Sequence, residues 1–324
     1  MNVTIPGAER LRGATDLAQA PRGHVDGRRG LIRAIAWTRI GLITLFGLVA
    51  LWRLTFLALH GSALFTEPAI DTLAARTWLA GGDPWLVEGP GGIRFGGPPT
   101  MLLPYAPLSL LDPAIARAII AGLAIGAAVA AIRRLQLPIW WILWPPLFEA
   151  VIHASFDSLI PLLFLVGAGP IAVLVKPYAA VALSSRGLVV AGFLGLATML
   201  ILPWGTFLRD LPTITESFRS QVAFGGLSAW GNPIAVALVG AAILSTWPRS
   251  RLAIPAGLWP FAQLHYGAMA LPLVARSPIL AAFMAIPIPG AAPAGIVVYA
   301  VLEFLRGRRA LERRSLVLGG ERRH

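Results

Sequence analysis

Long apolar runs that end in arginines are the feature that most restricts how this sequence folds. Two of them, 35–59 and 114–134, reach the roughly 20 residues that a helix needs to cross a bilayer. Hydrophobic residues make up 56% of the chain and charged residues 13%. Soluble domains are about 45–50% apolar and about 25% charged. The sequence therefore predicts an all-α polytopic membrane protein.

The arginines set the predicted orientation. The formal net charge is +12, but the arginines lie at the ends of apolar runs and in both tails, so no nucleic-acid partner is expected. Cationic segments stay on the cytoplasmic side. We predict a disordered basic cytoplasmic tail over 1–34, a transmembrane domain over 35–305 and a second basic cytoplasmic tail over 306–324. The absence of cysteine excludes disulfides, thiolate metal sites and a cysteine nucleophile.

The run pattern predicts about eight to ten transmembrane helices, and an even number because both tails are basic. Further predicted crossings lie at 139–156, 187–204, 233–247 and 252–275. Prolines interrupt three other regions: 98–113, 158–185 and 277–305. Each of them is compatible either with one tilted span or with a pair of short helices.

A large first extracytoplasmic loop is predicted over 60–113, with a second polar loop over 205–231. The first loop holds Glu67, Asp71, Asp83 and Glu88. Within it "IDTLAARTWLAGG" predicts a short helix that Gly81 and the next glycine end. Asp71 near its start fits either a helix cap or a general base facing the membrane surface. We expect Glu67 and Glu88 to be solvated, and Asp83 in "GGDPW" to form a turn.

Lys176 is the only lysine of the chain and stands within the apolar stretch "AVLVKPYAAVAL". An ionisable group inside a membrane costs about 2.5–3.5 kcal/mol on insertion scales, so it usually faces a cavity and a partner. One interpretation is that Lys176 snorkels to the headgroups. Because arginine fills that role elsewhere in the chain, we favour a cavity-facing ammonium that meets a carboxylate or a lipid phosphate.

Two histidines and an aspartate complete the candidates near the predicted outer face. His265 lies 14 residues after Arg251, which would place it about 20 Å along a continuous helix. His153 and Asp157 are four residues apart, so one helical turn would point them the same way. The sequence contains no Gly-rich phosphate loop, Ser-His-Asp order, HExxH or nucleotide fingerprint. No metal ligand and no certain cofactor is predicted, and a divalent metal stays open.

The order of these motifs resembles one known family. A span is followed by a long loop with an early aspartate, the turn "GGDPW", the segment "PPTMLLPYAPLSLLDP", the corner "HASFDSLIP" and a helix ending in "KPYAAVAL". This layout over 35–305 is similar to the bacterial polyprenyl-phosphate-mannose-dependent mannosyltransferases, formerly a domain of unknown function. That family has a Y-P-P-L segment and a G-Q-x-N corner where this chain has "YAPL" and "SFD".

The resemblance implies a GT-C-like bundle in the bacterial cell membrane with its active site on the extracytoplasmic face. It implies inverting transfer of a hexose, mannose in the family, from a polyprenyl-phosphate sugar donor to a glycolipid or glycan acceptor. Asp71 would be the general base, His265 a second catalytic residue, and Lys176 and Arg76 would bind the donor phosphate. Six further residues are candidates for substrate binding: Asp83, Tyr105, His153, Asp157, Tyr178 and Tyr266.

A multi-pass transporter or lipid flippase is the alternative. Lys176 and Asp157 would then form a charge pair in the transport pathway, and the proline-broken regions would be the interrupted helices of such proteins. The absence of an internal repeat and the concentration of acidic residues in one loop favour the enzyme.

Overall fold

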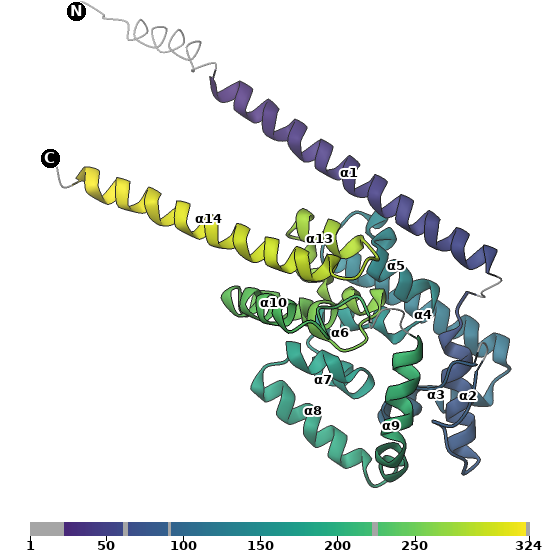
Figure 1. Cartoon of the computed structure of the whole chain (residues 1–324). Helices are drawn as coiled ribbons and strands as arrows, with labels where there is room; N and C mark the ends of the chain where they lie inside the picture. Colours follow the sequence, from purple (N-terminus) through teal and green to yellow (C-terminus); the bar gives the residue numbers. More distant parts are fainter. Residues whose placement is uncertain (1–22, 61–63, 90–91, 222–225, 322–324) are drawn as a thin grey trace, which may run out of the picture. The chain divides into compact units, whose positions relative to one another are not determined.

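The structure, a computed structural model, describes residues 23–60, 64–89, 92–221 and 226–321. In these ranges all its regular elements are helices, and the only strand-like pairing is a single bridge between Glu88 and Arg94. The expected all-α fold is confirmed. Residues 1–44 and 45–324 form two separate units. The first contains the beginning of α1 (Figure 1), and the residues that line the cavity described below all belong to the second.

Both expected tails are helical where the structure describes them. Helix α1 runs over Gly23–Leu59, so residues 23–34 continue the first apolar helix toward the N-terminus. Helix α14 runs over Ala291–Glu321 and includes most of the basic C-terminal segment. Residues 1–22 and 322–324 of the two predicted tails lie outside the described residues.

The first loop folds around one helix, α2 (Glu67–Leu79), which Gly81 follows in a left-handed conformation with φ of 79°. The helix starts four residues before Asp71, with Thr66 before it. Asp71 therefore lies in the second turn and is not the cap. After α2 the chain forms three short pieces: η3 (Pro99–Met101), α3 (Leu102–Tyr105) and η4 (Leu108–Leu110).

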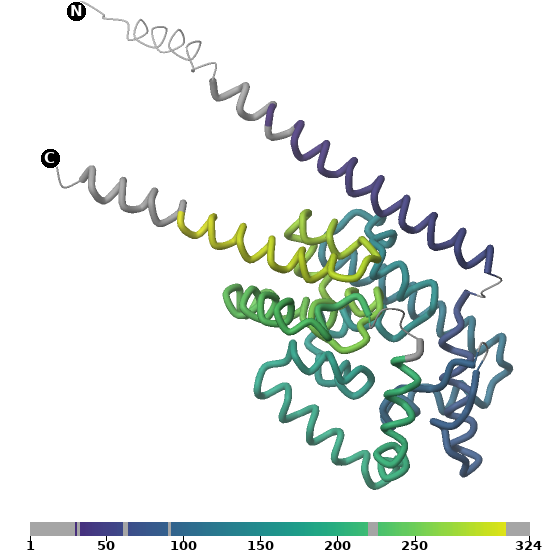
Figure 2. The backbone as a smooth tube through the Cα atoms, viewed as in Figure 1, coloured from purple at the N-terminus to yellow at the C-terminus, as the bar shows by residue number. Residues whose placement is uncertain are grey.

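Helix α4 (Pro113–Arg134) agrees with the expected span, but the apolar runs after it are broken. Up to residue 198 the chain forms η5 (Ile139–Leu143), α5 (Pro145–Ile152), η6 (Phe156–Ser158), α6 (Ile160–Leu165), α7 (Gly169–Val175), η7 (Pro177–Ala182) and α8 (Ser185–Thr198). Figure 2 traces these pieces and the tight turns between them. Region 158–185 is thus a set of short helices and not one tilted span. Proline stands at the first or second position of α4 and of four of these pieces, where its missing N–H costs no helical hydrogen bond: α5, α6, α7 and η7.

Two expectations for the C-terminal half were wrong. The second polar loop is largely a helix, α9 (Trp204–Gln221), because its apolar residues recur at helical spacing. Segment 252–275 is not one helix. The C-terminal elements are α10 (Pro233–Ser245), η9 (Arg249–Ala253), α11 (Ile254–Leu258), η10 (Leu264–Ala270), α12 (Leu271–Val274) and α13 (Pro278–Ala285) before α14. His265 therefore follows a break at Trp259-Pro260 and does not lie 14 residues into a helix.

Two described helices are long and apolar enough to cross a bilayer, Arg33–Leu59 and Pro113–Arg134. Four shorter apolar helical stretches of 10–17 residues lie at Phe156–Leu165, Ser185–Thr198, Pro233–Ser245 and Leu264–Val274. The count of eight to ten crossings remains a prediction.

The second unit has two apolar clusters. The first joins α2, α3 and α4 around Trp85, Leu102 and Tyr105, all at most 1% exposed. The second joins α6, η7 and η10 around Tyr178 and Tyr266, whose ring centroids are 4.8 Å apart. Helices α13 and α10 pack on α14 (Figure 1). Residues of both clusters line the cavity described next.

Candidate functional site

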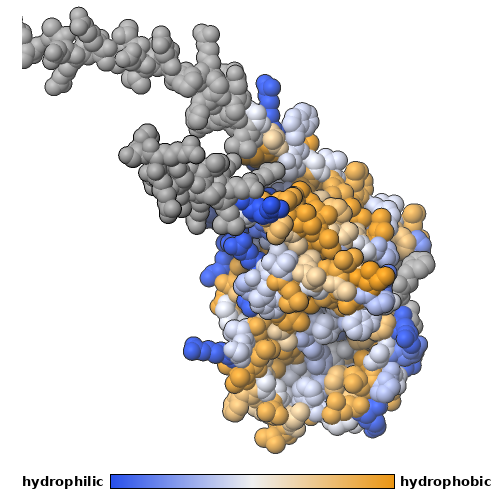
Figure 3. All heavy atoms as spheres, turned by 60° about the vertical axis from the view of Figure 1, so that its left-hand side comes forward, coloured by the Kyte–Doolittle hydropathy of each residue, from blue (hydrophilic) through white to orange (hydrophobic). Residues whose placement is uncertain are grey.

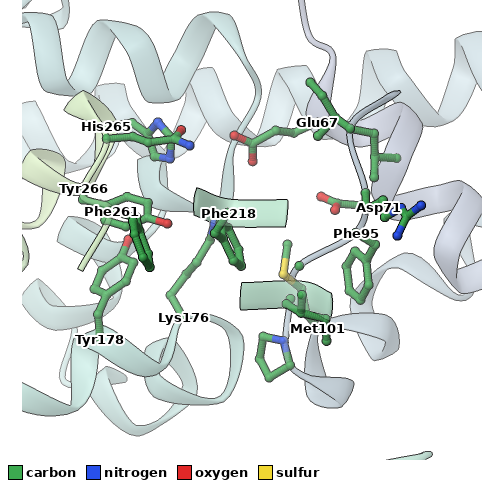
Figure 4. A pocket seen from close by; sticks show the side chains of 18 of the residues that line it. Glu67, Asp71, Phe95, Met101, Lys176, Tyr178, Phe218, Phe261, His265 and Tyr266 are labelled. Atoms are coloured by element: carbon green, nitrogen blue, oxygen red, sulfur yellow. The ribbon is translucent and has the colours of Figure 1, made fainter. Parts of the chain in front are cut away.

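One cavity of about 800 Å³ brings together residues from segments far apart in the sequence. Helix α2 supplies Glu67 and Asp71 from one side, while His265, Tyr266 and Tyr178 enter from the opposite side (Figure 4). Many apolar residues of the wall come from α9, from η3 and the loop before it, and from the segment before η10: Phe95, Met101, Phe207, Ile214, Phe218 and Phe261. The site therefore combines a polar centre with an apolar wall, as ligand pockets commonly do.

Among the acids outside the apolar helices, Asp71 has the pKa that lies furthest from its ordinary value. Asp71 is 6% exposed, and its Oδ2 has no hydrogen-bond partner among the described residues. Burial and the charge of Glu67 raise the pKa of Asp71 from its ordinary 3.8 to about 7. The nearby Tyr105 hydroxyl and the Lys176 ammonium offset part of this rise. Half of the Asp71 carboxyls are then ionised near neutral pH, as suits a general base.

Lys176 lines the same cavity because the chain ends α7 there. The following Pro177 disfavours a helical conformation for the residue before it, and Lys176 is extended, with φ of −131° and ψ of 97°. Its Nζ lies 2.9 Å from Asp157 Oδ2, and its side chain is 16% exposed. Lys176 thus has a carboxylate partner, and an ammonium with three donors keeps others for a ligand.

Asp157 stands behind Lys176 and is not part of the cavity wall. It is 1% exposed, and Oδ2 accepts a hydrogen bond from Ser155 Oγ at 2.6 Å. His265 Nε2 lies 3.8 Å from the same oxygen, while His265 itself lines the cavity. One buried carboxylate therefore positions both the ammonium and the imidazole of this wall.

His153 belongs to a different polar group from Asp157, contrary to the expected helical pair. Helix α5 ends at Ile152, directly before His153, and Ala154 follows with φ of 51°, which turns the chain away before Asp157. Glu149 Oε1 lies 2.6 Å from Arg53 Nη2 and 3.3 Å from His153 Nε2. His153 Nδ1 lies 3.2 Å from the hydroxyl of Thr66. These four residues form a second polar wall of the cavity.

Arg76, Asp83 and Tyr105 do not line the cavity. The Arg76 guanidinium donates to the carbonyl oxygen of Ser109 at 2.7 and 3.0 Å, so it fastens α2 to η4 and does not face a donor phosphate. Asp83 accepts from the backbone N–H of Trp85 at 3.0 Å, as the expected turn requires. Tyr105, with a hydroxyl that has no hydrogen-bond partner among the described residues, backs Asp71.

The Asp83 turn is also joined to α9. Arg209 Nη2 lies 2.5 Å from Asp83 Oδ2 and 2.9 Å from Asp210 Oδ2. Burial and the neighbouring Asp210 raise the pKa of Asp83, whereas the bond from Arg209 lowers the pKa of Asp210. This cluster positions the helix that covers part of the cavity.

Sequence reasoning missed Glu67, Arg53 and Glu149. Glu67 was expected to be solvated, yet its carboxylate points into the cavity (Figure 4). Its position four residues before Asp71 was the available signal, because residues so spaced share a face once the helix start is known. Arg53 lies near the end of the first apolar run, where an arginine ordinarily extends to the headgroups. No local pattern paired Arg53 with Glu149, 96 residues away.

Among the described residues, no group of three or more His, Asp or Glu side chains is placed to hold a metal ion. Comparisons with models of protein families, with curated proteins and with solved structures found no match to this chain. Its function is therefore inferred from the cavity and from the sequence motifs. The fold and the site define an all-helical protein with a buried acid–base and cationic centre.

Proposed function

We propose that this chain is an integral membrane glycosyltransferase of the GT-C type, with about eight to ten transmembrane helices. It transfers a hexose, mannose by resemblance, from a polyprenyl-phosphate sugar to a glycolipid or glycan acceptor on the extracytoplasmic face. The observation that carries this proposal is the one cavity that holds Asp71, with a pKa near 7, and the Lys176 ammonium.

In the proposed reaction Asp71 takes the proton of an acceptor hydroxyl. The acceptor oxygen then forms a bond to the sugar C1 while the bond from C1 to the phosphate oxygen breaks, so the anomeric configuration inverts. The departing polyprenyl phosphate carries the negative charge, which the Lys176 ammonium stabilises. A preorganised cation at the point where charge develops is a large contribution to catalysis in a site shielded from water.

The apolar wall supports a lipid-linked donor. Phe207, Ile214 and Phe218 of α9 face the cavity, and Phe261 approaches from the segment before η10. Such a surface suits a prenyl chain next to a charged phosphate. His265 lies on the Lys176 side of the cavity and is assigned to the leaving-group side of the reaction.

The exterior supports a membrane location. Apolar side chains cover much of the face in Figure 3, with charged ones in small groups. On α8, Val189 and Phe193 are 71% and 72% exposed, and Ile234 on α10 is 72% exposed. Contiguous apolar surface is rare on soluble monomers, whereas lipid accommodates it. Together with the cytoplasmic tails that the arginines predict, this surface supports a proposed site on the outer side of a bacterial cell membrane.

The test is transfer in proteoliposomes. Purified protein with polyprenyl-phosphate mannose and a membrane extract as acceptor should yield a product heavier by one hexose. Asp71→Asn should lower the rate at least 100-fold, within the range of general-base catalysis. Glu216→Gln, at an exposed glutamate of α9, is the control for expression and purification. A fully active Asp71→Asn variant would remove Asp71 from the mechanism.

A transporter or lipid flippase is the second candidate, and the buried Lys176–Asp157 ion pair favours it. The broken helices α6, α7 and η7 around that pair are also compatible with a pathway. Vesicles without acceptor separate the two functions. Movement of the labelled donor between leaflets with no product would support the flippase, while acceptor-dependent product without such movement would support the enzyme.

A further inference from the structure

Glu67 and Asp71 form a pair of carboxylates on one face of α2. They are four residues apart, so their side chains project from neighbouring turns in the same direction. Both line the cavity, and both carboxylates point toward its centre (Figure 4). Asp71 is buried, whereas Glu67 is half-buried at the start of the helix.

No cation neutralises Glu67 among the described residues. The cations that line the cavity have their own partners: Lys176 with Asp157, Arg94 with Glu88, and Arg53 with Glu149. The Glu67 carboxylate has neither a hydrogen bond nor an ion pair with a described residue. Its charge therefore acts on Asp71, whose burial reduces the screening by water.

We propose that Glu67 is a positioning residue that acts through Asp71: its negative charge makes Asp71 a stronger proton acceptor at neutral pH. This inference rests on the proposed function, since it assigns Glu67 to the same proton transfer. Glu67 touches no reacting atom in this role.

The sign follows from the groups that face Asp71. Glu67 on its own helix raises the pKa of Asp71, while Tyr105 of α3 and Lys176 after α7 lower it. On its own helix, Arg76 is turned to a carbonyl of η4, and on α4 Arg117 is exposed. Removing the Glu67 charge should therefore lower the pKa of Asp71. Activity that needs ionised Asp71 would then persist to lower pH.

The experiment measures the protonation of Asp71 directly. A hydrophobic carbodiimide reacts with protonated carboxyls, and mass spectrometry locates the adduct on Asp71 at each pH in the full-length protein. The variants are Glu67→Gln, which removes the charge, and Glu67→Asp, which keeps it. Glu216→Gln is the matched control, because Glu216 is an exposed glutamate of α9. Glu67→Ser replaces the Gln variant if that variant does not fold, since serine is accepted at helix starts.

We expect half-labelling near pH 7 in wild type and in Glu216→Gln. In Glu67→Gln the pH of half-labelling should fall by about half a unit or more, because removing a like charge from a shared site lowers the pKa of the remaining carboxyl. Glu67→Asp should restore most of the difference. At pH 6 the turnover of Glu67→Gln, as a fraction of its own maximum, should be about three times the same fraction in wild type. At pH 8 its turnover should fall below that of wild type.

Unchanged half-labelling in folded Glu67→Gln would overturn the inference, whatever the turnover. A shift in labelling from a wild-type protein that transfers no sugar would support the carboxylate pair and reject the proposed function. Sugar transfer by wild type, with no shift of labelling or of the pH profile in Glu67→Gln, would support the proposed function and reject the role of Glu67.

Discussion

At the scale of the residue, the folded state favours the neutral form of the Asp71 carboxyl. Asp71 ionises near pH 7 because the folded chain removes it from water beside another acid. Above its folded pKa the buried charge reduces stability, and below its ordinary value of 3.8 the effect disappears because both states are protonated. Each pKa unit is worth about 1.36 kcal/mol, which gives an upper limit of about 4 kcal/mol at alkaline pH.

Asp71→Asn should therefore be more stable than wild type as well as inactive. The gain in melting temperature should be largest at pH 8, should shrink as pH falls through 7, and should vanish near pH 4. Thermal unfolding of both proteins in one detergent across this pH range is the measurement. Equal melting temperatures at pH 8 would show that Asp71 is not buried as a charge.

The Lys176–Asp157 pair needs a test that treats its members together. Lys176→Met alone leaves Asp157 buried without its cation, and breaking such a pair costs about 3–5 kcal/mol. The double variant Lys176→Met, Asp157→Asn removes both charges and should recover most of that stability. Donor binding should stay weak in both variants if Lys176 binds the phosphate.

Lys176→Arg is the companion variant. A planar guanidinium does not replace a compact ammonium in a fitted cavity, so donor affinity should fall although the charge is kept. Binding of a polyprenyl-phosphate sugar by the three variants in nanodiscs is the readout. Wild-type affinity in the double variant would return Lys176 to a purely structural role.

At the scale of the element, α9 and the loop before η3 fit closely over the cavity. Phe207 lies 5.3 Å from Trp85 between ring centroids, and Phe218 packs on Gly96. The space at Gly96 admits no side chain, since an added Cβ would overlap the Phe218 ring. The helix is further held by Arg209 at the Asp83 turn.

Gly96→Ala should thus be destabilising by about 1–3 kcal/mol, the usual cost of overpacking. Phe218→Leu should relieve the overlap, so the double variant should melt above Gly96→Ala alone. Gly205→Ala is the control, because nothing lies within 4 Å of its added Cβ on the same helix. It should be neutral or stabilising. A Gly96→Ala protein as stable as wild type would show that α9 does not lie on this loop.

At the scale of the whole molecule, the arginines predict on which side of a membrane the cavity lies. The first loop should be extracytoplasmic and the end of α4 cytoplasmic. The chain contains no cysteine, so single cysteines report on this topology without background.

Glu88→Cys should react with an impermeant maleimide in intact cells. Arg134→Cys, at the exposed end of α4, should react only after permeabilisation. Labelling is read by mass shift on a gel. The reverse pattern would invert the topology and place the cavity on the cytoplasmic face.

The sequence by itself determined the all-α class, helix α4, the short helix around Asp71 with its glycine stop, and the Asp83 turn. It also singled out Lys176 as an ammonium that faces a cavity. These follow from composition, periodicity and the local rules for proline, glycine and a lone buried charge, which act over a few residues. Tertiary structure decided which residues share the cavity. Glu67 became a site residue only when α2 began there, Arg76 turned to a carbonyl, and Arg53 met Glu149 96 positions away in a separate element. Such partners are chosen by packing between distant segments, because a buried charge takes whichever counter-charge the fold brings within reach.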